Sequence, residues 1–364
     1  MRYLHRFVSL GALFVLSACE NEEASRSGSD PTPRAIVAEE LIRLDDAGQP
    51  IIARPERISV DSKGRFFVTD YSDKNIKVYD ATGSRVATIG RPGRGPGEFT
   101  ALLTAQSYRD SLVAWDAVSG KLSVFAPDGR YVRAISLTGT PFPVWSVRVV
   151  DDSLFLAIAA ATGIPARPAL ALIRPDGTRL STFYEPGQYV GTSPAVIQTI
   201  FVLADAADGT VFAGLAGGDS LWTFDYQGRR LGAAPVDAAH PLRTSRGIIE
   251  GNRGKVQRAD GSIVLDGEPA LFNLVALDSG RVAMQVEPWD LTHGTDPLGG
   301  GRVIVAATRP DGQPVTIASA ALEGGLLGRD REGAPLVLRY ATANEDAYAI
   351  TRLRLTAAST RGAP

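Results

Sequence analysis

A short phrase ending in glycine recurs along this chain of 364 residues. In each copy, residues typical of a strand run into a Thr-Gly, Asp-Gly or Gln-Gly turn, and glycine accepts the positive φ that a tight hairpin needs. The five copies end at Gly83, Gly129, Gly177, Gly228 and Gly312, so the intervals between them are 46, 48, 51 and 84 positions. The chain is therefore expected to be built from structural repeats.

The first repeat can be divided into four short strands. Alternating apolar residues occupy 57–60, 65–69, 76–79 and 85–89, and turn residues separate them. Beyond Ala18 no segment has sustained helical periodicity, and 38 glycines and 23 prolines suit a fold rich in turns. Four antiparallel strands in a repeat of this length predict an all-β fold, a single β-propeller, and exclude helical bundles and doubly wound sheets.

The ends of the chain predict how the ring closes. The five phrases indicate five four-stranded blades, and a last set at 326–329, 336–340 and 348–355 lacks one strand. We expect Ile36 to Leu44 to supply it, so that N- and C-terminal strands pair and no edge stays open. This gives six blades in a propeller over 35–357, with insertions at 237–270 and 287–301 and a disordered tail at 358–364. Seven blades is the alternative, because the long interval between Gly228 and Gly312 could hold a short blade.

The N-terminal segment 1–18 has the pattern of a secretion signal. Arg2 and Arg6 precede an apolar run from Phe7 to Ala18 that is too short to span a bilayer. The sequence Leu-Ser-Ala-Cys at 16–19 resembles the lipobox of bacterial lipoproteins, which implies lipidation of Cys19, the only cysteine. Residues 19–34 then form a lipidated flexible tether. The expected location is the cell envelope, anchored to the inner or outer membrane and either periplasmic or surface-exposed. The alternative is an ordinary signal followed by an unrelated cysteine.

Charge and cysteine content narrow the classes of partner. The formal net charge is −2, and we see no basic stripe of the kind that nucleic acid requires. With one cysteine the chain has no internal disulfide. The expected partners are a membrane, through the N-terminal lipid, and an envelope protein or glycan; the sequence does not indicate an oligomeric state.

Residues 54–80 resemble an NHL repeat, on the segments RPERISVD, GRFFVTD and NIKVYD. The segment GRPGRGPGEF at 90–99 is similar to the glycine-rich joint between blades of six-bladed NHL-like propellers, many of which are bacterial lipoproteins. The resemblance covers 54–133 and implies a fold, not a function.

Amidating lyases of this group hold zinc through histidines from several blades. Beyond the signal this chain has only His240 and His293, both in the insertions, so that zinc site is not carried over.

Two aspartates occupy equivalent places in the first two repeats. Asp70 and Asp116 each precede their turn glycine by 13 positions. We expect their carboxylates to cap the following turns, as Asp does there. The alternative is that they act as ligands of a divalent cation, the one cofactor that the sequence leaves open. His240 and His293, completed by Asp290 or Asp296, form a second weak candidate metal site.

The insertions are the expected binding surfaces. The first is locally basic and could dock an anionic partner through Arg243, Arg246, Arg253, Lys255 and Arg258. The alternative is that this insertion is a solvated loop that covers a blade edge and binds no partner. In the second insertion, Trp289 would indicate recognition if exposed, and His293 lies near it.

The sequence predicts a binding or scaffold module in the envelope and assigns no catalytic residue. We find no Gly-x-Ser-x-Gly elbow and no Ser-His-Asp arrangement. The alternative is a metal-dependent hydrolase or lyase acting at the mouth of the propeller channel. A convergent set of acids, amides or histidines at that mouth would favour the enzyme.

Overall fold

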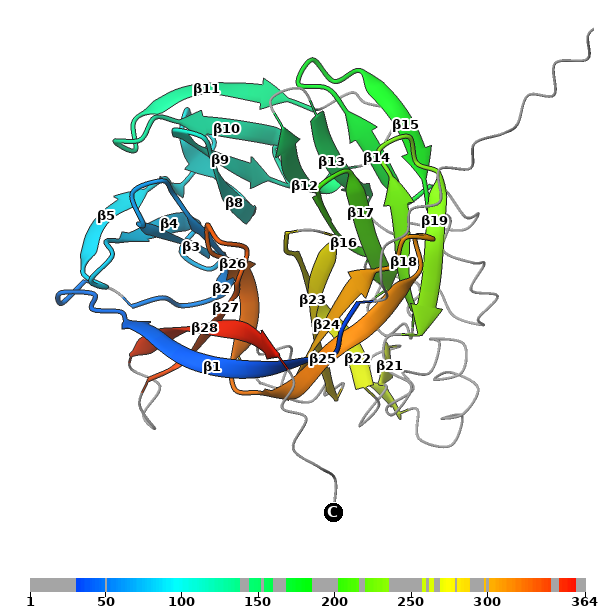
Figure 1. The fold of residues 1–364 in the computed structure, drawn as a ribbon. Coiled ribbons are helices and arrows are strands. Elements are labelled where there is room, and N and C mark those ends of the chain that lie inside the picture. The colour runs from blue at the N-terminus through cyan, green and yellow to red at the C-terminus, as the bar shows by residue number, and fades with distance from the viewer. Residues whose placement is uncertain are drawn as a thin grey trace, which may run out of the picture.

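The computed structural model describes most of the ring (Figure 1). The described residues are 31–49, 51–137, 144–151, 154–159, 168–184, 202–215, 220–235, 257–259, 262–264, 269–278, 280–288, 298, 301–341 and 347–357. They form strands and turns, and no helix among them is long and apolar enough to cross a membrane.

Six four-stranded antiparallel blades surround a central channel (Figure 1). The first blade holds β2 (Pro55–Val60), β3 (Phe66–Asp70), β4 (Asn75–Tyr79) and β5 (Arg85–Ile89). The second holds β8 (Leu102–Tyr108), β9 (Ser111–Asp116), β10 (Lys121–Phe125) and β11 (Tyr131–Ser136). The third holds β12 (Val144–Asp151), β13 (Leu154–Ala159), β14 (Leu170–Ile173) and β15 (Arg179–Phe183).

The other three blades follow the same order. The fourth holds β16 (Val202–Ala207), β17 (Thr210–Leu215), β18 (Ser220–Asp225) and β19 (Arg230–Pro235). The fifth holds β22 (Pro269–Ala276), β23 (Arg281–Pro288), β24 (Gly301–Thr308) and β25 (Pro314–Leu322). The sixth combines β26 (Gly325–Arg329), β27 (Pro335–Tyr340), β28 (Tyr348–Ala357) and the N-terminal β1 (Arg34–Arg43). The prediction of six blades is confirmed.

Strand β1 closes the ring as the sequence predicted. It pairs antiparallel with β28, from Arg34 opposite Ala357 to Arg43 opposite Ala349, with one bulge between Glu40 and Ile42. The outermost strand of the sixth blade thus comes from the other end of the chain, and the edge of β28 is covered.

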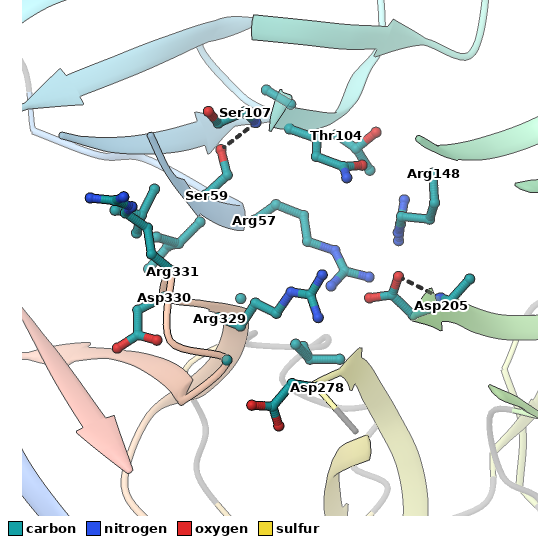
Figure 2. Close-up of a pocket in the computed structure, with 18 of the residues that line it drawn as sticks. Arg57, Ser59, Thr104, Ser107, Arg148, Asp205, Asp278, Arg329, Asp330 and Arg331 are labelled. Atoms are coloured by element: carbon teal, nitrogen blue, oxygen red, sulfur yellow. Dashed lines mark hydrogen bonds between the residues drawn. The ribbon is translucent and has the colours of Figure 1, made fainter. Parts of the chain in front are cut away.

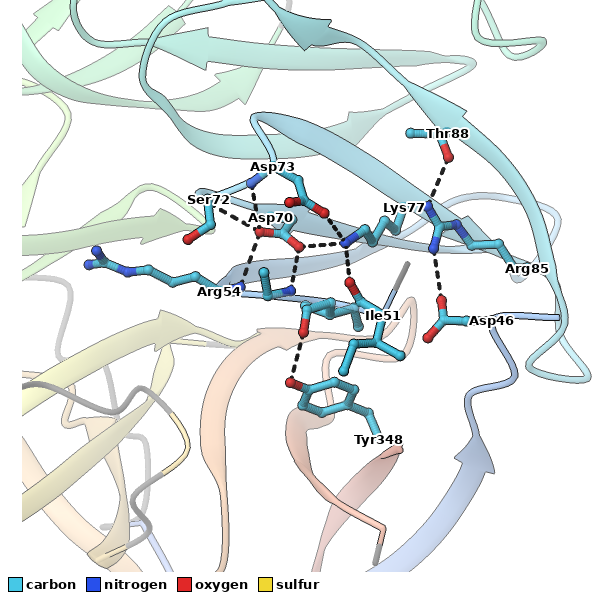
Figure 3. A network of polar contacts seen from close by, with 12 residues as sticks. Asp46, Ile51, Arg54, Asp70, Ser72, Asp73, Lys77, Arg85, Thr88 and Tyr348 are labelled. Atoms are coloured by element: carbon cyan, nitrogen blue, oxygen red, sulfur yellow. Dashed lines mark hydrogen bonds and ion pairs between the residues drawn. The ribbon is translucent and has the colours of Figure 1, made fainter. Parts of the chain in front are cut away.

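A cluster of polar contacts holds the segment between β1 and β2 against the first blade (Figure 3). The Nζ of Lys77 donates to the carbonyl oxygen of Ile51 and to carboxylate oxygens of Asp70 and Asp73, each at 2.6 Å. The hydroxyl of Tyr348 in β28 donates to the carbonyl oxygen of Ile52 at 2.8 Å. Because these contacts join the two ends of the chain to blade one, we call them the closure clasp.

The hydrophobic core is divided into six clusters, one between each pair of adjacent blades. Strand β23 shows the pattern: Ala283 faces the cluster shared with the sixth blade and Met284 the cluster shared with the fourth. Both faces of an inner strand are therefore apolar, and a polar side chain there must find a partner or reach the channel.

The inner strands of the first and last blades approach each other closely. A single parallel bridge joins Ile58 of β2 to Gly328 of β26. A Cβ at Gly328 would overlap the backbone carbonyl oxygen of Ile58, so only glycine allows this approach. The contact brings Arg57 and Arg329 to the same side of the channel.

The long interval before the fifth blade holds a small extra hairpin. Strands β20 (Gln257–Ala259) and β21 (Ser262–Val264) pair with each other in a separate two-stranded sheet. Strand β22 begins at Pro269, so the last residues of the predicted first insertion belong to a blade. The signal, most of the tether and the tail at 358–364 lie outside the described residues.

The predicted glycine-rich joint lies between the first two blades. Strands β6 (Arg91–Pro92) and β7 (Glu98–Phe99) form a parallel pair there. The carboxylate of Glu98 accepts the backbone N–H of Gly95 and pairs with Arg91, both at 2.8 Å. The chain continues from this loop into β8, as the sequence indicated, rather than into a helix.

Candidate ligand site at the channel mouth

A cavity of about 420 Å³ opens on the ring axis (Figure 2). The innermost strands of all six blades, or the turns that directly follow them, supply its lining. One lining residue from each blade, in ring order, is Arg57, Gln106, Arg148, Asp205, Val275 and Arg329. The cavity is therefore the mouth of the channel, and its size falls in the range of small-molecule sites.

Three arginines, Arg57, Arg148 and Arg329, extend into this cavity from different blades (Figure 2). Among the described residues, Arg57 has only long contacts, 3.4 and 3.5 Å, from its terminal nitrogens to the carbonyl oxygen of Leu274. Arg148 donates through Nη1 to Ser146 and to the carbonyl of Val147, while its buried Nε has no hydrogen-bond partner among the described residues. A guanidinium carries five N–H donors, so most donors of Arg57 and Arg148 have no partner in the described part of the chain.

Burial and mutual repulsion act on the pKa values of two of these arginines. Burial lowers the pKa of Arg57, while Asp205 and then Glu56 oppose that shift. Burial, followed by the charge of Arg57, lowers the pKa of Arg148 to about 9, and Asp205 opposes the change. Both groups stay protonated at neutral pH, so the cavity holds two adjacent positive charges.

Asp205 is the acidic group that faces these arginines (Figure 2). Its Oδ1 accepts the backbone N–H of Ala206 at 2.9 Å, and its Oδ2 accepts that of Ala276 at 3.3 Å. Within the described parts of the chain it forms no close ion pair. The carboxylate is thus held in place by backbone donors while its charge remains unpaired at short range.

The neutral polar side chains of the lining are already used between blades. The amide of Gln106 donates to the carbonyl of Val149 at 2.8 Å and accepts its N–H at 3.0 Å. Thr104 donates to Val147 at 3.3 Å, and Ser59 accepts the N–H of Ser107 at 3.1 Å. These contacts join neighbouring inner strands and occupy the amide of Gln106, so the arginines are the charged donors that the lining offers a ligand.

Acidic residues at the rim are paired to arginines outside the cavity. Asp278 pairs with Arg281. The Oδ2 atom of Asp330 lies 2.7 Å from the Nε of Arg352, in an ion pair whose geometry is not that of a hydrogen bond. The Oδ1 atom of Asp330 accepts two backbone N–H groups of its turn. Asp278 and Asp330 therefore do little to neutralise Arg57 and Arg148.

Asp70 and Asp116 lie at the ends of β3 and β9, where their carboxylates accept backbone N–H groups. Asp70 accepts from Ala53, Arg54, Ser72 and Asp73, and Asp116 from Thr100, Ala101, Val118 and Ser119. Each joins the entry of its blade to the next turn, and neither lines the channel-mouth cavity. Among the described residues no group of three or more His, Cys, Asp or Glu could hold a metal ion.

The other predicted site residues fall where the structure gives no description. These are Cys19, His240, Arg243, Arg246, Arg253, Lys255, Trp289 and His293, and for Arg258 only the backbone of β20 is described. Their roles stay predictions.

Sequence reasoning missed Arg57, Arg148 and Asp205, although one signal pointed to them. Each is a charged residue inside the first strand of a repeat, in the segments ERISV, SVRVV and LADAA. First strands lie innermost in a propeller, so a charge within one marks the channel.

Comparisons with known proteins agree with this architecture. Residues 39–137 match the family model DUF5128, described as a 6-bladed beta-propeller. No match was found among curated protein sequences.

Two solved structures from Bacteroides have a similar fold. A member of the DUF4221 family from Bacteroides vulgatus is 13% identical, with a TM-score of 0.60 over 90% of this chain and 99% of that one. A protein from Bacteroides fragilis, described as exported, is 11% identical, with a TM-score of 0.58 over 88% and 95%. At such identities the likeness concerns the fold alone. From its six four-stranded blades, its closing strand pair and these comparisons, the chain is a six-bladed β-propeller protein.

Proposed function

We propose that this protein is a membrane-tethered binding module of the bacterial cell envelope that holds a small anionic ligand at the channel mouth. The observation that carries the proposal is the pair Arg57 and Arg148, which face one cavity and have most of their N–H donors without a partner among the residues that the structure describes. Guanidinium groups match the planar geometry of carboxylates and the oxygens of phosphate.

The chemistry of the lining supports binding rather than turnover. Arginine keeps its proton at neutral pH, so Arg57 and Arg148 can hold and orient an anion but do not exchange protons as a general acid or base would. The lining strands are rigid parts of six blades, which pre-organises the donors and reduces the entropy lost on binding.

Replacing Arg148 with Gln is expected to weaken anion binding by about 10- to 100-fold, because a hydrogen bond to a charged group contributes about 1.5–3 kcal/mol. Isothermal titration calorimetry with butanoate, and separately with inorganic phosphate, measures the change on the full-length protein in detergent. Arg57→Gln should act in the same direction. Arg133→Gln, on the exposed face of the outermost strand β11, is the matched control and should bind as wild type does. Equal affinities for all four proteins, or no detectable binding by wild type, would remove the channel mouth as an anion site.

The envelope location rests on the lipobox-like sequence at 16–19. Replacing Cys19 with Ala removes the thiol that accepts the diacylglycerol, so the protein should accumulate as an unprocessed precursor or leave the membrane fraction. Metabolic labelling with a fatty acid, followed by membrane fractionation, measures both effects. Ser17→Ala keeps the thiol and serves as the control. Normal processing and unchanged membrane association of Cys19→Ala would contradict lipid anchoring.

A further inference from the structure

We infer that the ligand of the channel mouth is a small zwitterion, whose anionic group binds Arg57 and Arg148 and whose cationic group binds Asp205. The inference rests on the proposed anion site and names the ligand class more narrowly. Amino carboxylates are the simplest ligands of this kind.

Asp205 has the acceptor capacity that a cationic group needs. A carboxylate offers about four lone-pair sites, and the backbone N–H groups of Ala206 and Ala276 use two of them. The two donors come from adjacent blades, since Ala206 lies in β16 and Ala276 ends β22. They fix the carboxylate toward the cavity without neutralising it.

The charges of the cavity also disfavour a purely anionic ligand. An anion that reaches Arg57 and Arg148 also comes under the field of Asp205, the acid that acts on both arginines. A ligand with a second, cationic group turns that repulsion into attraction. The effect is greater in an enclosed, partly dehydrated cavity than at a surface, because charges there are screened less.

The opposing interpretation gives Asp205 a purely structural role, as the counter-charge that allows two arginines to face one another. In that case replacing Asp205 would lower stability and would tighten the binding of every anion equally. A zwitterion site predicts a different result. Replacing Asp205 should then weaken binding only of those probes that carry an ammonium group.

Three probes with similar skeletons separate these cases: 4-aminobutanoate carries both charges, butanoate only the negative one, and glutarate two negative ones. Calorimetry on the full-length protein in detergent should show 4-aminobutanoate binding at least about 10-fold more tightly than butanoate. Asp205→Asn should weaken 4-aminobutanoate by about 10- to 100-fold and leave butanoate unchanged or slightly tighter. Asp128→Asn, in the exposed turn between β10 and β11 and away from the cavity, is the matched control and should change neither affinity by more than a few-fold.

The outcomes distinguish this inference from the proposed function. If butanoate and glutarate bind through Arg148 but the ammonium group gives no advantage, the anion site stands and the zwitterion assignment is overturned. The zwitterion assignment is also overturned if Asp205→Asn tightens the binding of all three probes, or if Asp128→Asn weakens 4-aminobutanoate as much as Asp205→Asn does. If none of the probes binds wild type, the proposed function itself fails.

Discussion

Deletion of residues 35–46 is expected to lower the melting temperature by roughly 5–15 °C or to make the protein aggregate. The deletion removes β1, and with it Ile42 and Leu44, which are buried between the sixth and first blades. Burying one such side chain contributes about 1.5–3 kcal/mol, so these two account for roughly 3–6 kcal/mol. In a chain of this size each kcal/mol corresponds to about 1.5 °C, so the loss of these two side chains alone accounts for roughly 5–9 °C. The edge of β28 would also be exposed, which favours aggregation.

The deletion also leaves buried polar groups of the first blade without partners. The carboxylate of Asp46 accepts the hydroxyl of Tyr79 at 2.6 Å and pairs with the buried guanidinium of Arg85 at 2.8 Å. Burial, followed by the contact with Asp46, raises the pKa of Tyr79, so the hydroxyl is protonated and acts as the donor. Without Asp46 both side chains lose an acceptor in the interior, which adds to the cost.

Removal of residues 20–33 is the matched control, because it shortens the chain by a similar length but leaves β1 intact. Its melting temperature, measured by circular dichroism at several protein concentrations, should equal that of wild type. Equal melting temperatures for both deletions would show that pairing of β1 with β28 does not hold the ring closed.

The fold could be predicted because its signals are local. Turn glycines such as Gly83 and Gly129 need positive φ, and both have it. Strand alternation around them fixes the blades, and counting strands at the C-terminus then assigns β1 to the sixth blade. None of these steps requires knowledge of which residues meet across the ring.

The site could not be predicted in this way because it exists only when the ring closes. Arg57 and Arg148 are 91 positions apart in the sequence and meet because their strands are both innermost. The insertions were predicted as binding surfaces because their amino-acid composition, such as a cluster of arginines, can be recognised in a short stretch of sequence. Charged residues within apolar strands indicate the channel site better than the composition of the insertions does. The same pattern, however, also occurs at charged residues that have only a structural role.

Lys77 is such a structural residue. In the sequence it looks like an outward-facing lysine of an alternating strand, yet its side chain is 1% exposed. It is buried because the segment around Ile51 covers it when β1 closes the ring (Figure 3). Burial raises the pKa of Asp70, but hydrogen bonds from Lys77 and from the N–H of Ala53 outweigh it, and the net pKa lies below the usual range.

Replacing Lys77 with Met should destabilise the fold by about 3 kcal/mol, because it leaves the buried carboxylate of Asp70 without its cation. Methionine has a similar length, so the loss reflects charge and hydrogen bonds more than packing. The equivalent carboxylate in the second blade, Asp116, has the hydroxyl of Thr100 as a donor in addition to backbone N–H groups. Asp70 has no hydroxyl donor among the described residues, so in Lys77→Met only backbone N–H groups would remain to stabilise its carboxylate. Lys121→Met, an exposed lysine on β10, is the control and should change stability by less than about 0.5 kcal/mol.

The pH dependence of the Lys77→Met deficit tests whether the lost charge pair is its cause. Because the folded pKa of Asp70 is depressed in wild type, its contribution to stability is present above the unfolded pKa of about 3.9 and is lost as pH falls through the folded value. In the variant the cation no longer depresses that pKa, so a proton binds the buried carboxylate more readily. The difference in unfolding free energy between wild type and Lys77→Met, from urea denaturation, should therefore be largest near pH 7 and should narrow below about pH 4. A deficit that stays constant over this range would assign the loss to packing, and no deficit at all would show that the closure clasp does not depend on Lys77.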